Sequence, residues 1–249
     1  KLTRILGHLK RRFHDVTSVT MAYLAAVCAA EGQQVLGTRG QLLDADVALV
    51  LSSLVDHRQE TAWADAMRAR GTRVGFVGLA ASKLPDVFLP HADFVIDGEP
   101  EEAVGRLARG ERLEGACQSG AADDLDALPF PRWDLVAERP GRALDVPFSG
   151  RPLGGAFPVL ASRSCPEFCT YCPHRILAPY RSRSVESVAD ELDRLCAQDS
   201  RPYVIFRDPL FTQDRDRCEA LSVEIMRRRL DLRFECETRL DRLDPGLVD

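Results

Sequence analysis

Three cysteines within eight residues form the part of the sequence best suited to chemistry. Cys165, Cys169 and Cys172 have the spacing C-x3-C-x2-C. Three thiolates at this separation can hold three irons of a cubane iron–sulfur cluster, which leaves the fourth iron without a protein ligand. An open iron can bind a substrate or cofactor. The spacing therefore predicts a 4Fe–4S site for chemistry rather than a simple electron relay.

Zinc is the alternative metal for the same cysteines. It requires four ligands in a tetrahedral arrangement, and His174 or Cys196 would have to supply the fourth. Zinc sites usually pair two C-x2-C knuckles, and the sequence has no second knuckle, so we favour iron and sulfur over zinc. A thioredoxin-type redox pair is disfavoured because three cysteines lie together rather than two.

The composition is typical of a globular protein of the reducing cytoplasm. Hydrophobic residues make up 45% of the chain and charged residues 29%. A chain of 249 residues is long enough for one large domain or two ordinary ones. The net charge of −5 argues against a general nucleic-acid or membrane footprint. No apolar run is long enough to span a bilayer, and eight unevenly spaced cysteines do not fit a secreted disulfide scaffold. Because the chain runs from Lys1 to Asp249 and stops within a repeating pattern, we expect a fragment that lacks both ends.

The first part of the chain alternates strands and helices. A continuous apolar run at 47–51 suits a buried parallel strand, and further strands are expected at 73–77 and 94–96. Helices are expected at 59–70 and 99–109, each followed by glycine. The alternation predicts an α/β fold with a doubly wound parallel sheet, which binds ligands beyond the carboxyl ends of its strands.

An acidic, proline-punctuated segment separates this pattern from a second one. Residues 123–131, followed by Trp133, have this composition. We therefore place a linker at 113–155, between a first domain at 1–112 and a second at 156–249. We expect the aromatic side chains to anchor the linker to a neighbouring surface.

The second domain repeats a strand–helix unit. Strands are expected at 159–161, 203–206 and 233–237, with helices at 185–197 and 215–229. Three such units predict the N-terminal part of a β/α barrel, truncated on its C-terminal side. In such barrels the functional residues lie at the carboxyl ends of the strands.

Residues on either side of the cysteines match a known pattern. The run Ser162-Arg163-Ser164-Cys165, Tyr171 directly before the last cysteine, and the pair Arg183-Ser184 together resemble the radical S-adenosylmethionine (SAM) superfamily. The resemblance implies a 4Fe–4S cluster on the three cysteines, SAM chelating the open iron, and reductive cleavage of SAM to a 5′-deoxyadenosyl radical. It also implies a small-molecule substrate and an external one-electron reductant such as flavodoxin or ferredoxin.

The ends of the two later strands extend this resemblance. Segments 206–212 (FRDPLFT) and 236–239 (CETR) resemble second- and third-strand motifs of the superfamily. The likeness implies four SAM contacts: Tyr171, Asp208, Glu237 and Arg239. A carboxylate would bond the ribose hydroxyls, and the guanidinium would pair with the methionyl carboxylate. Helix capping and surface ion pairs are the alternatives for the two acidic residues. The superfamily's common Gly-Gly-Glu motif is absent at Asp208-Pro209.

The first domain resembles one branch of that superfamily. Segments 21–35 and 93–101 resemble the first helix and the last strand and turn of cobalamin-binding domains that precede radical SAM barrels, and 125–132 resembles their joining segment. The likeness implies cobalamin as a second cofactor. The cobalt-ligating Asp-x-His-x-x-Gly pattern is absent, so we expect no histidine ligand from it. The expected corrin-facing residues follow the strands, although the glycines also suit turns. They are Ser52, Ser53, Gly78, Gly98 and Glu99.

Three functions are open from the sequence. We favour a cobalamin-dependent radical SAM enzyme that transfers a methyl group to an unactivated carbon, or oxidises or cyclises there. The second is a radical SAM enzyme whose first domain is a scaffold without cobalamin. The third, from a different class, is a zinc-stabilised binding or regulatory protein.

Overall fold

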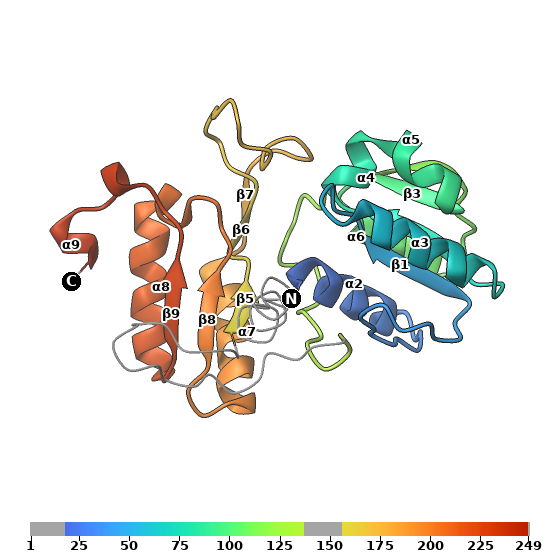
Figure 1. Ribbon diagram of the computed structural model, residues 1–249. Helices are drawn as coiled ribbons and strands as arrows, with labels where there is room; N and C mark the ends of the chain where they lie inside the picture. Colours follow the sequence, from blue (N-terminus) through green and yellow to red (C-terminus); the bar gives the residue numbers. More distant parts are fainter. Residues whose placement is uncertain (1–17, 137–155, 249) are drawn as a thin grey trace, which may run out of the picture. The chain divides into compact units, whose positions relative to one another are not determined.

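The computed structural model describes residues 18–136 and 156–248, which fall into two compact units (Figure 1). Among the described residues, the first unit is built mainly from residues 20–136, and the second mainly from residues 156–175 and 179–248. Each unit has a sheet of its own.

The first unit is a four-stranded parallel sheet in the order β1-β2-β3-β4. Its strands are β1 (Val47–Leu51), β2 (Arg73–Val77), β3 (Phe94–Gly98) and β4 (Gly115–Ser119). β1 pairs with β2 along its whole length, from Val47 opposite Arg73 to Leu51 opposite Val77. Because the strands are parallel, their carboxyl ends all lie at one edge of the sheet.

Helices cover both faces of this sheet, which confirms the doubly wound prediction. One face carries α2 (Val19–Ala30) and α6 (Glu101–Ala108). The other carries α3 (His57–Arg68), α4 (Leu79–Lys83), α5 (Pro85–Phe88) and the short 3-10 helix η1 (Leu89–His91). Alternation along β3 gives this division, since Phe94 and Ile96 pack with α2 and α6 while Val95 packs with α3 and α5. A sheet buried on both faces explains the continuous apolar run of β1.

Part of the segment expected to be a linker belongs to the first unit. Gly115–Ser119 forms the edge strand β4 and pairs with β3 along its whole length. The sheet thus extends past the boundary predicted at residue 112. Farther along, the Arg132 amide donates to the Ala22 carbonyl of α2 at 3.0 Å, and Trp133 is only 4% exposed. The expected aromatic anchor is confirmed at Trp133. Residues 137–155 of the predicted linker lie outside the described residues.

The second unit has a three-stranded parallel sheet in the order β5-β8-β9. Its strands are β5 (Ala156–Val159), β8 (Tyr203–Phe206) and β9 (Arg233–Cys236). Their last residues Val159, Phe206 and Cys236 stand opposite one another, so three loops begin side by side at the carboxyl edge. The repeat predicted from the sequence is confirmed as a parallel α/β sheet. Closure of that sheet into a barrel stays a prediction.

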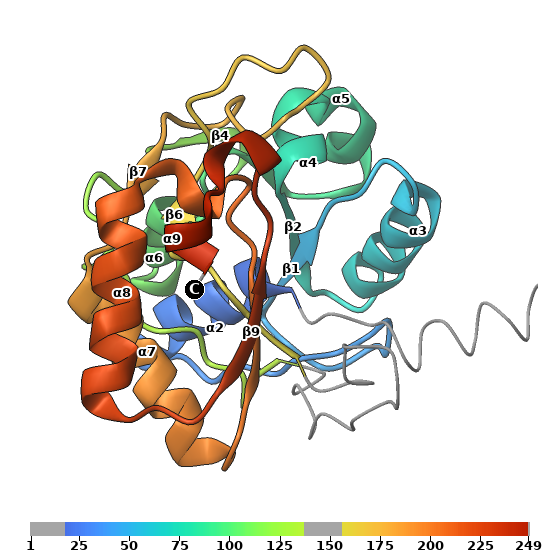
Figure 2. The same cartoon turned by 90° about the vertical axis from the view of Figure 1, so that its left-hand side faces the viewer.

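The two long helices of this unit, α7 (Val185–Gln198) and α8 (Arg215–Arg228), pack against each other (Figure 2). Each begins at a side-chain cap. The Ser184 hydroxyl accepts a hydrogen bond from the Ser187 amide at 3.0 Å, and the Asp214 carboxylate accepts one from the Arg217 amide at 3.1 Å. Three shorter elements complete the unit: η2 (Phe211–Gln213), η3 (Leu240–Arg242) and α9 (Pro245–Val248).

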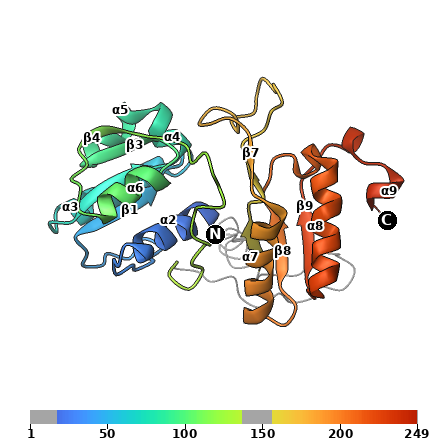
Figure 3. The ribbon, with the colours of Figure 1, turned by 180° about the vertical axis from the view of Figure 1, so that it is seen from behind.

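A narrow two-stranded ladder carries the cysteine loop. Strands β6 (Ser162–Arg163) and β7 (Arg181–Ser182) run antiparallel, with Ser162 opposite Ser182 and Arg163 opposite Arg181. We call this ladder the neck. Residues 164–180 form the loop beyond it, and they extend away from β5 in Figures 1 and 3. Because the neck joins both ends of the loop, the placement of the cysteines depends on what holds the neck.

Candidate functional site

Residues that follow the strands of the second unit gather at the root of the cysteine loop. Arg207, directly after β8, donates its amide to the Val159 carbonyl at the end of β5 at 2.8 Å. Its guanidinium Nη1 lies 3.2 Å from Oε1 of Glu237, directly after β9. The loop, Asp208 and Glu237 thus share one edge of the sheet, as the strand pattern predicts.

The three motif cysteines are half-buried free thiols on the loop. The Cys172 amide donates to the Cys169 carbonyl at 3.2 Å, which turns the chain between the last two thiols. Within residues 18–136 and 156–248, no group of three or more His, Cys, Asp or Glu side chains could hold a metal ion. The donors are of the right kind and lie on one loop. That the three thiols hold one cluster stays a prediction.

Ser164, directly before the first cysteine, has two features of a functional turn. Its φ of 66° is in the left-handed region, which residues other than glycine seldom adopt. Its Oγ is buried and has no hydrogen-bond partner among the described residues. Strained backbone and unsatisfied buried polar atoms are costly and cluster at binding sites. Both features fit a group bound beside Cys165.

His174 brings the far part of the loop to the strand ends. Burial lowers the pKa of the imidazole, while the negative charge of Glu237 raises it and the positive charge of Arg207 lowers it. The neighbouring charges place His174 near the Arg207–Glu237 ion pair. Glu237 is therefore already paired at the edge of the sheet, and its expected bond to a ribose stays a prediction.

Arg239 lies beside the first half of the loop. Its Nε and Nη2 donate to the two carboxylate oxygens of Asp241 at 2.9 and 2.6 Å, and its Nη1 donates to Oε2 of Glu167 at 3.2 Å. Hydrogen bonding to Asp241, followed by the charges of Asp241, Glu167 and Cys169, raises the pKa of the guanidinium. Arg239 thus contacts the cysteine loop through Glu167, which lies between Cys165 and Cys169.

Asp208 is completely buried beneath the neck. Its Oδ2 accepts from the Ala161 amide at 3.1 Å and its Oδ1 from the Ser162 hydroxyl. Burial raises the pKa of this carboxyl, whereas the bonds from Ser162 and Ala161 and the charge of Arg217 lower it. Both oxygens are engaged by the root of the loop. The geometry favours a positioning role for Asp208 over the expected contact with SAM.

A buried ion pair that we did not predict holds the neighbouring part of the neck. Arg183 donates to the Leu160 carbonyl at 3.1 Å and pairs with Glu191 of α7, and the two side chains are 4% and 3% exposed. A signal for this pair is present in the sequence. Glu191 falls on the buried stripe of α7 with Leu192 and Leu195, where a carboxylate needs a cationic partner.

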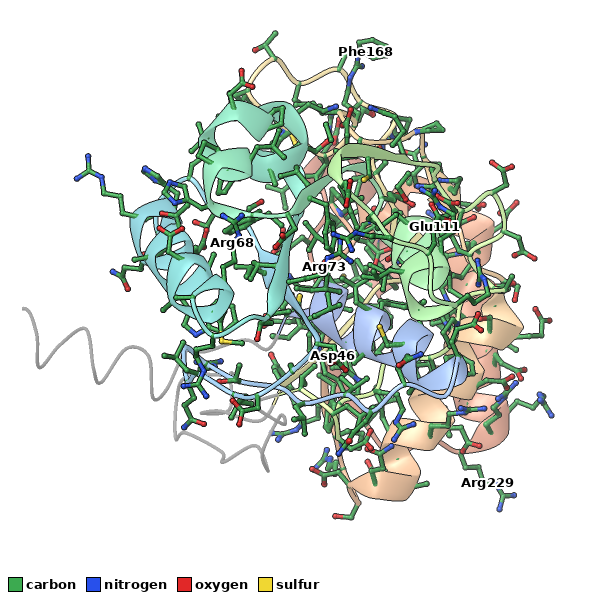
Figure 4. The ribbon with its side chains drawn as sticks, turned by 90° about the vertical axis from the view of Figure 1, so that its right-hand side faces the viewer. Asp46, Arg68, Arg73, Glu111, Phe168 and Arg229 are labelled. Carbon is green, nitrogen blue, oxygen red and sulfur yellow. The ribbon has the colours of Figure 1, made fainter. Side chains whose placement is uncertain are left out.

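Two aromatic residues in the outer part of the loop lie in solvent. Tyr171 is 88% exposed and Phe168 is 80% exposed. The Arg175 guanidinium lies 3.4 Å from the centroid of the Phe168 ring, a cation–π contact, and Figure 4 shows Phe168 at the outer end of the loop. The contact of Tyr171 with SAM that the resemblance implies stays a prediction.

In the first unit, the residues expected to face a corrin lie at the carboxyl edge of the sheet, after β1, β2 and β3. They are Ser52, Ser53, Gly78, Gly98 and Glu99. The Ser52 hydroxyl donates to the Val77 carbonyl and accepts from the Ala81 amide, both at 2.8 Å. The Ser53 hydroxyl accepts from the Val55 amide at 3.1 Å. Both hydroxyls shape the edge itself, so contact with a corrin stays a prediction.

Replacing Gly98 by alanine is expected to destabilise the first unit by about 1–3 kcal/mol, the usual cost of overpacking. Gly98 has a φ of 115°, and a Cβ there would lie 2.2 Å from the Ser119 carbonyl oxygen of β4. Strands β3 and β4 would have to separate. Urea denaturation followed by circular dichroism measures the loss. Gly120→Ala is the matched control because a Cβ there meets nothing within 4 Å. Equal losses in both variants would contradict this explanation.

Within the described residues, no helix has the length and apolar character needed to cross a membrane.

Comparison with known proteins finds a distant relative. The chain is 27% identical over 172 residues to a Pyrococcus horikoshii protein named uncharacterized methyltransferase PH0819. The match covers 61% of this chain and 36% of that protein, so the chain matches about a third of its relative's length.

The other comparisons add little. No family pattern matches the chain. The N-terminal domain of the hypothetical protein TM0182 from Thermotoga maritima has a TM-score of 0.33 and 15% identity, over 43% of this chain and 97% of that one. A structural likeness of that degree assigns neither a fold family nor a function. What the chain itself presents is a parallel α/β unit with three free thiols on one loop at its carboxyl edge.

Proposed function

We propose that this chain is part of a radical SAM enzyme that methylates, oxidises or cyclises an unactivated carbon of a small-molecule substrate. The observation that carries the proposal is the cysteine loop itself. It leaves the carboxyl edge of a parallel sheet and is contacted there by Arg239, from the end of the next strand but one. The distant methyltransferase relative supports methyl transfer as the leading reaction class.

The residues have separate tasks in this proposal. Cys165, Cys169 and Cys172 would hold a 4Fe–4S cluster as thiolates. When bound, the reduced cluster supplies one electron for the cleavage of SAM, and an external donor such as flavodoxin or ferredoxin would restore that electron. Arg239 would pair with the carboxylate of SAM, and Glu237 would accept from its ribose hydroxyls. Asp208 would hold the root of the loop rather than the cofactor.

The first unit would bind cobalamin at the carboxyl edge of its sheet. Doubly wound sheets bind ligands at this edge, and the five expected residues lie at the end of a strand or directly after one there. The rival assignment is a scaffold without cobalamin. The protein is produced with cobalamin in the growth medium and then desalted. Corrin absorbance that remains after desalting supports binding, and the absence of that absorbance supports the scaffold.

Anaerobic reconstitution with iron and sulfide tests the proposal for the second unit. We expect a brown protein with about four irons per chain, as a 4Fe–4S cluster requires. Adding SAM to the reduced protein should change its electron paramagnetic resonance signal. Binding of zinc in place of iron would instead favour the zinc-stabilised regulatory protein.

Replacing Cys169 by alanine is expected to abolish cluster assembly, because two thiolates cannot replace the three that the site requires. Iron content after reconstitution measures this. Cys196→Ala is the matched control, since Cys196 is a half-buried free thiol on α7 and outside the loop. Iron uptake that survives Cys169→Ala, or that is lost equally in Cys196→Ala, would refute the assignment of the ligands.

A further inference from the structure

Glu167 occupies a central place in the cysteine loop. It lies between the first two motif cysteines, and each of its carboxylate oxygens faces a different arginine. Oε2 lies 3.2 Å from Nη1 of Arg239, and Oε1 lies 3.1 Å from Nη2 of Arg242. Both arginines belong to the segment after β9. The carboxylate therefore joins the loop to the end of the third strand.

The same contact engages one of the N–H groups that Asp241 leaves on Arg239. Its Nε and Nη2 are taken by Asp241, which leaves Nη1 as the donor that faces the loop. Glu167 accepts from that nitrogen. A carboxylate of the chain thus already pairs with the Nη1 side of Arg239, the residue that would pair with the carboxylate of SAM in the function proposed above.

We propose that Glu167 competes with the carboxylate of SAM for Arg239. When SAM binds, Glu167 releases Arg239 and keeps its contact with Arg242. This inference rests on the function proposed above. Arg242 lowers the free-energy cost of the exchange, because Glu167 keeps one cationic partner after it releases the other. Glu167 is thereby a positioning residue that tunes the affinity of the site without touching the reacting atoms.

The exposure of these side chains sets the size of the effect. The side chains of Glu167, Arg239 and Arg242 are 28%, 48% and 42% exposed. Ion pairs at such sites are weak, so their removal changes an equilibrium by about two- to fivefold. The exchange is correspondingly easy to reverse.

Binding of SAM to the reconstituted protein, measured anaerobically by calorimetry, tests the exchange. Glu167→Gln should bind SAM about two- to fivefold more tightly than the unchanged protein, because the ligand no longer displaces a carboxylate. Arg242→Gln should bind it more weakly by a similar factor, because Glu167 then has Arg239 as its remaining partner. Decarboxylated SAM should bind alike to the unchanged protein and to Glu167→Gln.

The control is Glu219→Gln, which removes one negative charge from an exposed ion pair with Arg215 on α8. It should leave SAM affinity unchanged. Iron content is measured for every variant, and all should retain the cluster. If the unchanged protein takes up iron but does not bind SAM, the proposed function fails, and this inference fails with it. If it binds SAM and Glu167→Gln binds it equally or more weakly, the competition alone is refuted. Loss of iron in Glu167→Gln would likewise overturn it, since Glu167 would then brace the loop.

Discussion

Replacing Arg183 by methionine is expected to lower the free energy of unfolding by about 3–5 kcal/mol, the cost of breaking a buried ion pair from one side. Methionine keeps much of the side-chain volume but leaves the Glu191 carboxylate buried without its cation. Oε1 of Glu191 already has no hydrogen-bond partner among the described residues, so little remains to compensate it. Hydrogen exchange detected by mass spectrometry should place the loss of protection in α7 and at the neck.

The double variant Arg183→Met, Glu191→Leu separates charge from packing. Removing both charges should recover most of the lost stability, because an apolar pair of similar volume is often as stable as a buried ion pair. If the double variant is as unstable as Arg183→Met alone, the loss comes from the hydrogen bonds that Arg183 donates to Leu160 and Ser187 rather than from the stranded carboxylate.

Replacing Asp208 by alanine should cost about 3 kcal/mol, because a buried amide and a buried hydroxyl each lose an acceptor. The Ala161 amide and the Ser162 hydroxyl would then have no carboxylate to hold them. With the root of the loop released, iron uptake should fall as well. Asp190→Ala is the matched control, since that carboxylate pairs with Arg228 and is 54% exposed. Equal losses from the two variants would contradict a positioning role for Asp208.

The charge of Asp208 also predicts a pH dependence. Burial raises the pKa of this carboxyl in the folded protein, so the folded state holds the proton more tightly than the unfolded state. Its contribution to stability is therefore present at low pH and is lost as the pH rises from about 4 through the raised pKa. Asp208→Asn, which cannot ionise, should remove this decline from denaturation curves measured across that range.

The alternation of strand and helix segments was enough to predict both parallel sheets apart from β4. The apolar run at Val47–Leu51 predicted a strand covered on both faces, and its half-buried residues pack against both hydrophobic clusters. The strand order placed Arg207 and Glu237 beside each other, and they form an ion pair there. Parallel strands bring their following residues to one edge whatever the side chains are, so position at strand ends is readable from sequence.

Contacts that depend on the direction of a side chain could not be predicted from the sequence in this way. Asp208 follows its strand as predicted, but its carboxylate turns inward to the Ala161 amide, a choice that depends on where the neck runs. Strand β4 was hidden because its sequence, Gly115–Ser119, is short, half-exposed and rich in small residues. The exposure of Tyr171 depends on how far the loop is closed, and periodicity carries no information about that.

The neck described above has an evolutionary consequence. The two facing residue pairs of the neck join both ends of residues 164–180 to the unit, and the backbone of Ala161 beneath them is held by Asp208, Arg183 and Arg217. None of these anchors lies within the loop. We therefore expect replacements between the two ends to leave the sheet and its helices intact. On this expectation, the chemistry of the loop can change during evolution while the sheet and helices stay the same.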